Sequence, residues 1–566
     1  MKFCHAIGLT MAIFQVSASD QLDGWYPCAE YTFSDEGTSS GQKAECAIYM
    51  APMCYPGICD SPKSQDSKVD IFVKRLPAVS VAEKATNVWL IEGGPGAPTT
   101  GFEEAMLQLH AKLNGTANVY TMEHRGTGRS TLFDCVAAQV QTTGSPHGRD
   151  IDPTEVASCA KALEFKYDNY ATFSITSAAT DLSTLISKYT NGASTVVYGV
   201  SYGSTVVERL MFLNPPEVVG YVMDGISTTS ATSADKFQYF SVAETDYGEV
   251  GDHLLGFCAQ DSVCSTHFAN KSLPDTLEDL LTQFDKDPNS TCATLVDNKA
   301  SGDVKPSFKL RKTLGELLSG PEDRTLIPPI VYRLNRCSPE DVDVMSSFFD
   351  VLNGDSNPSQ NKPYFSNLLF FLIVFSEMWE IPGPSVAEMN PQFASTKLSD
   401  GSVYQLALVY CAFSKEKSSW CEELGVGDYD AKAIMYERDQ YWNKSTTIPS
   451  QASALLLSSK LDPITPHKYA EHLLEVLEGD NKELVTFNYT RHGTVAWSFP
   501  IDNVYTGETC GMNVLASYVS SGGDLQKLDR SCVGEMPRAP DYGIDIYHEH
   551  LHSINNVIAS LLSTNK

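Results

Sequence analysis

A serine flanked by glycines, between a strand-like run and a helix-like run, is the feature that most constrains this chain. Residues 199–203 read Gly-Val-Ser-Tyr-Gly and fit the pattern G-x-S-x-G. The β-branched and aromatic run 195–198 before them favours a buried strand, and apolar residues at helical spacing follow over 204–213. A tight strand-to-helix turn of this kind presents its central side chain at the edge of a sheet. The segment therefore predicts a nucleophile elbow, with Ser201 as the nucleophile.

The same pattern occurs a second time, at residues 37–41, in a different context. That stretch is rich in serine, glycine and acidic residues, no strand-like run precedes it, and no amphipathic run follows it. Because the chemistry requires the strand, the turn and the helix together, we interpret residues 37–41 as a loop.

Strand-like and helix-like runs alternate on both sides of the elbow. The strand-like runs are 88–91, 117–120, 196–198, 220–223, 454–457 and 483–487. Such alternation indicates βαβ units and a parallel sheet. From about 227 to 442 helical periods dominate instead, as in Leu277–Phe284. The sequence thus predicts one α/β sheet that is interrupted by a large, mainly helical insertion.

The expected domains follow from these changes of pattern along the chain. They are a signal peptide at 1–18, an N-terminal Cys-rich extension at 19–69, the first part of the α/β core at 70–226, a helical cap at 227–442, and the second part of the core at 443–566.

The N-terminus has the pattern of a secretory signal peptide. A positive start at Met1-Lys2 precedes an apolar run over 3–14 and the small-residue motif Val16-Ser17-Ala18. Cleavage after Ala18 would remove Cys4, one of 15 cysteines, and leave an even number, as an oxidising compartment favours. Five Asn-x-Ser/Thr sequons fit a glycosylated surface. We therefore expect a secreted, extracellular protein.

Cysteines that lie close in sequence suggest disulfide partners. The suggested pairs are Cys135–Cys159, Cys258–Cys264, Cys411–Cys421, Cys510–Cys532 and Cys292–Cys337, with Cys28, Cys46, Cys54 and Cys59 as an N-terminal cluster of open connectivity. No C-x-x-C pair occurs, and no histidine has ligand spacing beside a cysteine. We therefore expect neither a metal site nor a cofactor.

Composition limits the partners of this chain. A hydrophobic content of 42% with 20% charged residues is typical of a globular protein. The net charge of −29 argues against binding to nucleic acid or to an anionic membrane surface. The apolar run 368–375 is too short to span a bilayer, so we interpret it as a buried cap helix. The sequence leaves the oligomeric state open.

A serine nucleophile needs a base, and the base needs an orienting carboxylate. In hydrolases with this elbow, the acid and then the histidine follow the serine along the chain, each on a loop beyond a strand end. Asp462 follows the strand-like run 454–457, and His492 follows the next one. They are the predicted acid and base. Asp224, just beyond the strand after the elbow, is the competing acid.

Two backbone N–H groups must also face the charge that develops on the substrate carbonyl. The residue directly after the nucleophile, Tyr202, is expected to supply one of them. The second should come from the glycine loop 93–96, which follows an early strand. Pro95 has no N–H group, so we expect Gly94 to be the donor.

Three motifs together resemble the prolyl aminopeptidase and tripeptidyl aminopeptidase branch of the α/β-hydrolases. They are Gly-Gly-Pro-Gly at 93–96, Glu-His-Arg-Gly-Thr-Gly-Arg-Ser at 123–130, and the elbow preceded by Asp181-Leu182. The portion from Leu455 through Asp462, His492 and Cys510-Gly511 to Cys532 resembles the tripeptidyl-aminopeptidase C-terminal domain. The chain departs from the family at Glu123, where Asp is usual, and at Glu92, where the family often has His or another residue.

The resemblance implies an α/β-hydrolase fold and a serine exopeptidase that acts on a peptide substrate near its free N-terminus. An aminopeptidase needs a carboxylate to bind the substrate ammonium group. Glu377 is the predicted receptor because it ends an apolar helical run, although an exposed helix-end glutamate is the competing interpretation. The other cap acids that stay open are Asp235, Glu244, Asp246 and Glu249.

Two other classes of function remain open on the same residues. A secreted esterase or lipase would use the same triad and would differ in the cap pocket. A non-catalytic binding protein on a hydrolase fold would typically have lost the serine, the acid or the histidine, and here all three are present.

Overall fold

The computed structural model describes residues 21–59, 67–136, 150–231, 237–296, 304–320, 323–352, 362–500 and 507–537. The predicted signal peptide, the last part of the predicted second core segment and Asp235 lie outside these residues.

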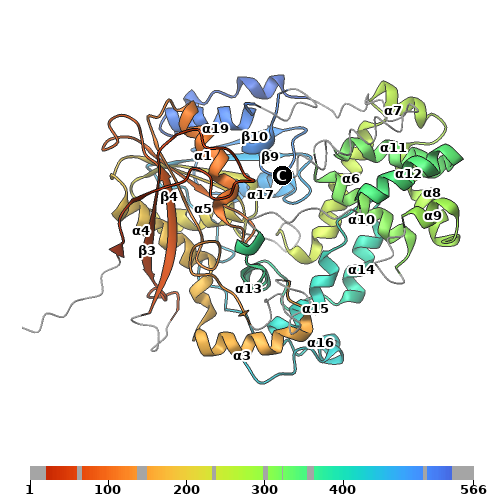
Figure 1. Cartoon of the computed structure of the whole chain (residues 1–566), viewed down its shortest axis with the longest axis horizontal. Coiled ribbons are helices and arrows are strands. Elements are labelled where there is room, and N and C mark those ends of the chain that lie inside the picture. The colour runs from red at the N-terminus through yellow and green to blue at the C-terminus, as the bar shows by residue number, and fades with distance from the viewer. Residues whose placement is uncertain are drawn as a thin grey trace, which may run out of the picture.

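The described part of the chain is built around one ten-stranded mixed sheet (Figure 1). Its strands are β1 (Gln21–Leu22), β2 (Tyr26–Cys28), β3 (Ala44–Pro52), β4 (Lys68–Leu76), β5 (Asn87–Ile91), β6 (Asn118–Met122), β7 (Thr195–Ser201), β8 (Val218–Ile226), β9 (Ser453–Ser459) and β10 (Lys482–Phe487). The order is β1-β3-β4-β6-β5-β7-β8-β9-β10, and β2 pairs with β3. Strands β5 to β10 run parallel to one another. Strands β1 to β4 form an antiparallel edge, which joins the parallel part through the antiparallel pair β4 and β6.

Helices cover both faces of the sheet, which explains why its central strands are continuous apolar runs. Successive side chains of a strand point to opposite faces. Trp89 and Ile91 of β5 therefore pack in one core with α4 (Ile175–Tyr189) and α5 (Tyr202–Leu213). The alternate residues Val88 and Leu90 pack in a second core with α1 (Glu103–Lys112) and α19 (Cys510–Ser520). The other core helices are α3 (Val156–Lys166), α17 (His467–Val476) and α18 (Thr494–Trp497).

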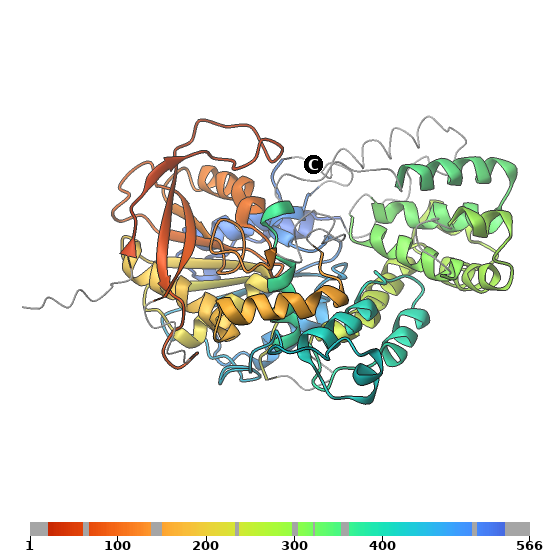
Figure 2. The same cartoon turned by 60° about the horizontal axis from the view of Figure 1, so that its bottom comes forward.

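Between β8 and β9, the regular elements of the described residues are all helices. The α-helices of this segment are α6 (Ala243–Phe257), α7 (Ser262–His267), α8 (Leu273–Lys286), α9 (Thr291–Leu295), α10 (Pro306–Leu318), α11 (Ile327–Arg336), α12 (Pro339–Leu352), α13 (Asn367–Glu377), α14 (Val386–Ser395), α15 (Val403–Ser414) and α16 (Ser419–Leu424). Helices α6 to α12 share an apolar core of their own and form a lobe beyond the sheet (Figures 1 and 2). Residues of α13 to α15 instead belong to the main core.

Short 3₁₀ helices are the remaining regular elements among the described residues. They are η1 (Thr99–Phe102), η2 (Pro153–Glu155), η3 (Tyr170–Phe173), η4 (Phe240–Val242), η5 (Asp323–Leu326), η6 (Lys362–Tyr364), η7 (Leu525–Lys527) and η8 (Ser531–Glu535).

This architecture is the α/β-hydrolase fold with a large helical cap, as the sequence predicts. Each strand-like run of the sequence overlaps a strand of the parallel part of the sheet, from β5 to β10. Within the predicted Cys-rich extension at 19–69, strands β1 to β3 join the antiparallel edge of the sheet. Residues 37–41, the second match to the serine pattern, form a loop.

The apolar run 368–375 is part of α13, whose residues Leu368 to Glu377 are largely buried. Within the described ranges, no helix combines the length and the apolar character that crossing a membrane requires.

Four of the five cysteine pairs suggested by the sequence form disulfide bonds. The four cysteines of the N-terminal cluster form two more bonds. The bonds are Cys28–Cys46, Cys54–Cys59, Cys258–Cys264, Cys292–Cys337, Cys411–Cys421 and Cys510–Cys532. The suggested Cys135–Cys159 disulfide is wrong for this structure, in which the two residues are buried thiols. They lie in contact, and their hydrogen bond, with burial, raises the pKa of Cys159. Spacing in sequence indicates that such cysteines are near each other, but it does not decide between a thiol pair and a bond.

Candidate active site

Ser201 occupies the turn between β7 and α5, with backbone angles φ +57° and ψ −127°. A non-glycine residue with a positive φ is strained, and such strain persists where the surrounding structure fixes the backbone. The flanking glycines allow the close packing that does so. A Cβ atom on Gly199 would lie 2.3 Å from the carbonyl oxygen of Gly203, and one on Gly203 would lie 2.3 Å from that of Ile91. The segment therefore adopts the elbow geometry that its sequence predicts.

His492 and Asp462 meet beyond the ends of β10 and β9. The Nδ1 atom of His492 lies 2.7 Å from Oδ2 of Asp462. Asp462 is 1% exposed, and its Oδ1 accepts hydrogen bonds from the N–H groups of Ile464 and Thr465 at 2.9 and 3.0 Å. The carboxylate is thus fixed by its own loop. It orients the imidazole so that Nε2 is left for a proton transfer.

Ser201 and His492 line the same cavity, which has a volume of about 530 Å³. The glycine loop after β5 forms the adjoining wall, and a Cβ atom on Gly93 would lie 3.4 Å from Oγ of Ser201. Apolar side chains of α1 and α19 line another part of the cavity. The fold thus brings the predicted nucleophile and base to one cavity.

The charges around His492 favour its protonated form. Burial alone lowers the pKa of the imidazole, but the charge of Asp462 and its hydrogen bond raise it, and Asp224 adds to this. The net result is a pKa above the ordinary value for histidine. A base with such a partner is stabilised when it takes up a proton from the nucleophile.

Asp224, the competing acid, accepts hydrogen bonds from the residues that follow His492 in the chain. Its Oδ1 accepts hydrogen bonds from the N–H and the hydroxyl of Thr494, both at 2.9 Å. Its Oδ2 accepts from the N–H of Val495 at 2.9 Å and from the Tyr198 hydroxyl at 2.8 Å. Asp462 is therefore the acid that contacts the imidazole, whereas Asp224 stabilises the turn that follows His492.

The two predicted oxyanion donors, Tyr202 and Gly94, come from the start of α5 and from the glycine loop after β5. Tyr202 begins α5, where backbone N–H groups and the helix dipole favour negative charge. Gly94 lines the cavity, whereas the N–H of its neighbour Gly93 donates to Oε1 of Glu92 at 2.9 Å. In the described part of the chain, the Gly94 N–H has no such partner. The geometry is therefore compatible with the prediction for Gly94.

Glu92 and Arg491 are charged residues of this cavity that sequence reasoning did not assign to the site. Burial raises the pKa of Glu92 to about 7, while the Gly93 N–H and the charge of His492 act in the opposite direction. Arg491 lies next to His492 in the chain, and its guanidinium stacks 3.4 Å over the ring of Trp497. The signal for Glu92 was its departure from the family pattern. For Arg491, the only signal was its position beside the predicted base.

Arg125 of the 123–130 motif has a structural role. Arg125 forms an ion pair with Asp181 at 2.6 Å, and both side chains are 0% exposed. Arg125 also donates to the carbonyl of Thr172 at 2.8 Å. Because a buried charge is stable only when it is paired and hydrogen-bonded, this contact fixes the motif against α4.

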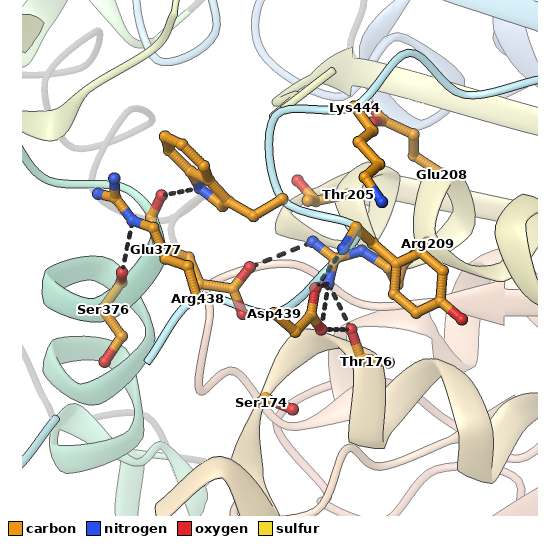
Figure 3. Close-up of polar contacts among 12 residues, drawn as sticks. Ser174, Thr176, Thr205, Glu208, Arg209, Ser376, Glu377, Arg438, Asp439 and Lys444 are labelled. Atoms are coloured by element: carbon orange, nitrogen blue, oxygen red, sulfur yellow. Dashed lines mark hydrogen bonds and ion pairs between the residues drawn. The ribbon is translucent and has the colours of Figure 1, made fainter. Parts of the chain in front are cut away.

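Glu377 lies against Arg209 of α5, the helix that follows Ser201. Its Oε2 lies 3.2 Å from Nη2 of Arg209, and its Oε1 accepts a hydrogen bond from the Tyr436 hydroxyl at 2.7 Å. Figure 3 shows that Asp439 faces the same guanidinium, at 2.9 Å. Glu377 is 1% exposed and, among the described residues, is not part of the cavity wall. It therefore belongs to a buried ion network between α13 and α5.

The other cap acids are also engaged by the protein. Glu244 accepts hydrogen bonds from backbone N–H groups of the cap, and Lys468 pairs with both Asp246 and Glu249. Within the described ranges, none of these three lines the cavity. Asp235 lies outside the described residues.

Comparisons with known proteins add little to this geometry. No family model matches the chain, and no curated protein matches it. Solved structures that are similar include an esterase from Exiguobacterium antarcticum (12% identity, 75% of this chain and 90% of that one, TM-score 0.27). A bromoperoxidase from Bacillus anthracis is another (13% identity, 79% and 94%, TM-score 0.28). A third is acetyl xylan esterase 1 from Thermoanaerobacterium sp. JW/SL YS485 (9% identity, 84% and 84%, TM-score 0.30). Likenesses this weak say nothing about activity.

Proposed function

We propose that this protein is a serine hydrolase, and more specifically a secreted exopeptidase of the aminopeptidase type. The observation that carries the proposal is that Ser201, in a strained elbow, shares one cavity with His492, whose Nδ1 lies 2.7 Å from Asp462. This arrangement fits acyl transfer through a covalent intermediate.

The reaction follows from the positions of these groups. Oγ of Ser201 attacks the scissile carbonyl, and Nε2 of His492 takes the hydroxyl proton while Asp462 stabilises the imidazolium. The N–H groups of Tyr202 and Gly94 receive the oxyanion. His492 then protonates the leaving amine, and a water molecule, deprotonated by His492, hydrolyses the acyl-enzyme.

The aminopeptidase assignment is supported by the family motifs at 93–96 and 123–130 and by a carboxylate inside the cavity. Glu92 is the carboxylate that a substrate ammonium group would meet beside Ser201. Glu377, which the sequence favours, stays a prediction for this role, and its existing pairing with Arg209 argues for a structural one.

The proposed extracellular location is supported by the signal-peptide pattern and by six disulfide bonds within the described residues.

Covalent labelling tests the nucleophile directly. A fluorophosphonate probe should label the full chain at Ser201, and Ser201→Ala should abolish both labelling and turnover while the protein remains folded. Ser39→Ala is the matched control, because Ser39 has the same flanking pattern but lies in a loop. It should be labelled and active like the unaltered protein. Turnover that survives in Ser201→Ala would overturn the proposal.

An esterase on the same triad is the alternative. Peptides with a free N-terminus, the same peptides N-acetylated, and simple acyl esters separate the two functions. The aminopeptidase assignment requires that acetylation reduces kcat/KM, since the carboxylate of Glu92 then has no cation to bind.

A further inference from the structure

Arg491 is a cation in the catalytic cavity that the proposed reaction does not use. Its guanidinium lies over Trp497, with Cζ 3.4 Å from the ring centroid. Within the described ranges, the guanidinium donates no hydrogen bond to a protein group and has no carboxylate at ion-pair distance. A stacked guanidinium keeps its in-plane N–H groups available for a ligand.

A second arginine increases the positive charge at this end of the site. Arg324 of η5 is 0% exposed, and its Nε and Nη1 have no hydrogen-bond partner in the described residues. Only its Nη2 donates, to the carbonyl of Tyr489 at 2.7 Å. This contact joins the cap to the loop that carries Arg491. Asp323 acts on both arginines through its charge, without an ion pair to either one in the described part of the chain.

Arg491 remains a cation under physiological conditions. Burial and the charge of Arg324 lower the pKa of Arg491 to about 10, which is still well above neutral pH. In a protein with a net charge of −29, a cavity cation without an ion-pair partner among the described residues is a specific feature rather than part of a general basic surface.

The position of Arg491 indicates which half of the substrate it meets. His492 must reach the leaving amine in order to protonate it, and Arg491 is the adjacent residue on the same loop. Glu92 lies on the other loop, beside the predicted oxyanion donor Gly94. Glu92 and Arg491 thus line one cavity from two different loops, and we assign Glu92 to the acyl side of the substrate and Arg491 to the leaving side.

We propose that Arg491 binds a carboxylate of the leaving group, so that the preferred substrates carry a negative charge directly after the scissile bond. This inference rests on the proposed function. The carboxylate has two possible sources: the C-terminus of a short peptide, or an acidic side chain of a longer one. Guanidinium groups recognise both through the same paired N–H donors.

Matched peptides test the inference on the full-length protein. Alanine peptides of increasing length, each as free acid and as C-terminal amide, report on the terminal carboxylate. Peptide amides with Asp or Asn after the scissile bond report on the side chain. In the unaltered protein, kcat/KM should be about 10- to 100-fold higher for the charged member of at least one pair.

Substitution then identifies the receptor. In Arg491→Gln, the ratio of kcat/KM between the charged and the uncharged peptide of a pair should fall close to one. Arg491→Lys should restore part of this ratio. Arg75→Gln is the matched control, since Arg75 also stacks on an indole ring, that of Trp25, but pairs with Glu45 outside the cavity. It should leave the preference unchanged. A preference that survives in Arg491→Gln would overturn the inference.

Binding separates this inference from the proposed reaction. In Ser201→Ala protein, calorimetry should show tighter binding of the charged peptide of a pair, and Arg491→Gln should remove the difference. Efficient turnover in the unaltered protein with equal kcat/KM for both members of every pair refutes the role of Arg491 and leaves the hydrolase assignment intact. Tighter binding without any turnover supports Arg491 and refutes the hydrolase.

Discussion

Asp224 and Thr494, which are 270 positions apart, are joined by two hydrogen bonds of 2.9 Å to one carboxylate oxygen. The contact holds the turn that directly follows His492. It also explains how a chain with two acids in plausible positions can use them differently. Asp462 contacts the imidazole, and Asp224 supports the backbone beside it.

Substitution of the two acids should therefore have different effects. Asp462→Asn places an amide where Nδ1 of His492 donates, which favours the wrong tautomer, and kcat should fall by about 10³- to 10⁴-fold. Asp224→Asn leaves buried donors facing an amide group, and the free energy of unfolding should fall by about 1–3 kcal/mol. Steady-state kinetics and thermal unfolding measure the two effects. A larger loss of kcat in Asp224→Asn would make Asp224 the working acid.

The activity should have an acidic limb that reflects His492. The reaction needs the neutral imidazole, and the Asp462 carboxylate outweighs burial and raises its pKa. The inactive protonated form therefore persists to higher pH than for an ordinary histidine. With an ester substrate that has no amine, kcat/KM should fall about tenfold per pH unit below a midpoint above 6.5. A midpoint below that value would contradict the assignment.

Glu92→Gln should weaken substrates with a free N-terminus selectively. The amide keeps the acceptor for the Gly93 N–H but loses the charge, so KM for free peptides should rise about 10- to 100-fold. KM for N-acetylated peptides should not change. Because burial raises the pKa of Glu92 to about 7, binding of the ammonium group should weaken as pH falls below 7. If Glu377→Gln instead causes the selective loss, the sequence prediction for Glu377 is correct.

Arg209→Met should destabilise the protein strongly. It leaves the buried Glu377 carboxylate without its cation, and breaking such a pair costs about 3–5 kcal/mol. Lys271→Ala is the matched control, because it removes an exposed ion pair with Asp279, and should cost at most about 1 kcal/mol. Chemical denaturation of both variants gives the comparison. Equal stability of the two variants would show that the buried network contributes little.

Much of the fold could be predicted from the sequence, because strands buried on both faces and amphipathic helices leave local patterns. The runs at 88–91 and 454–457 and the helical stretch between 227 and 442 are examples. The elbow was local as well, since Gly199 and Gly203 are needed for backbone contacts within a few residues of Ser201 or with the neighbouring strand. Chain order and strand ends then pointed to Asp462 and His492.

What the sequence could not determine are contacts between residues far apart in the chain. Only the tertiary structure shows that Glu377 pairs with Arg209, 168 positions away, and that Asp224 holds Thr494. The same holds for Cys135 and Cys159, whose spacing suggested a bond. The local sequence pattern indicates whether a side chain is buried. Which residue it contacts there depends on how the whole chain packs. For that reason the sequence determined the predicted nucleophile, base and acid, and the structure decided which charges line their cavity.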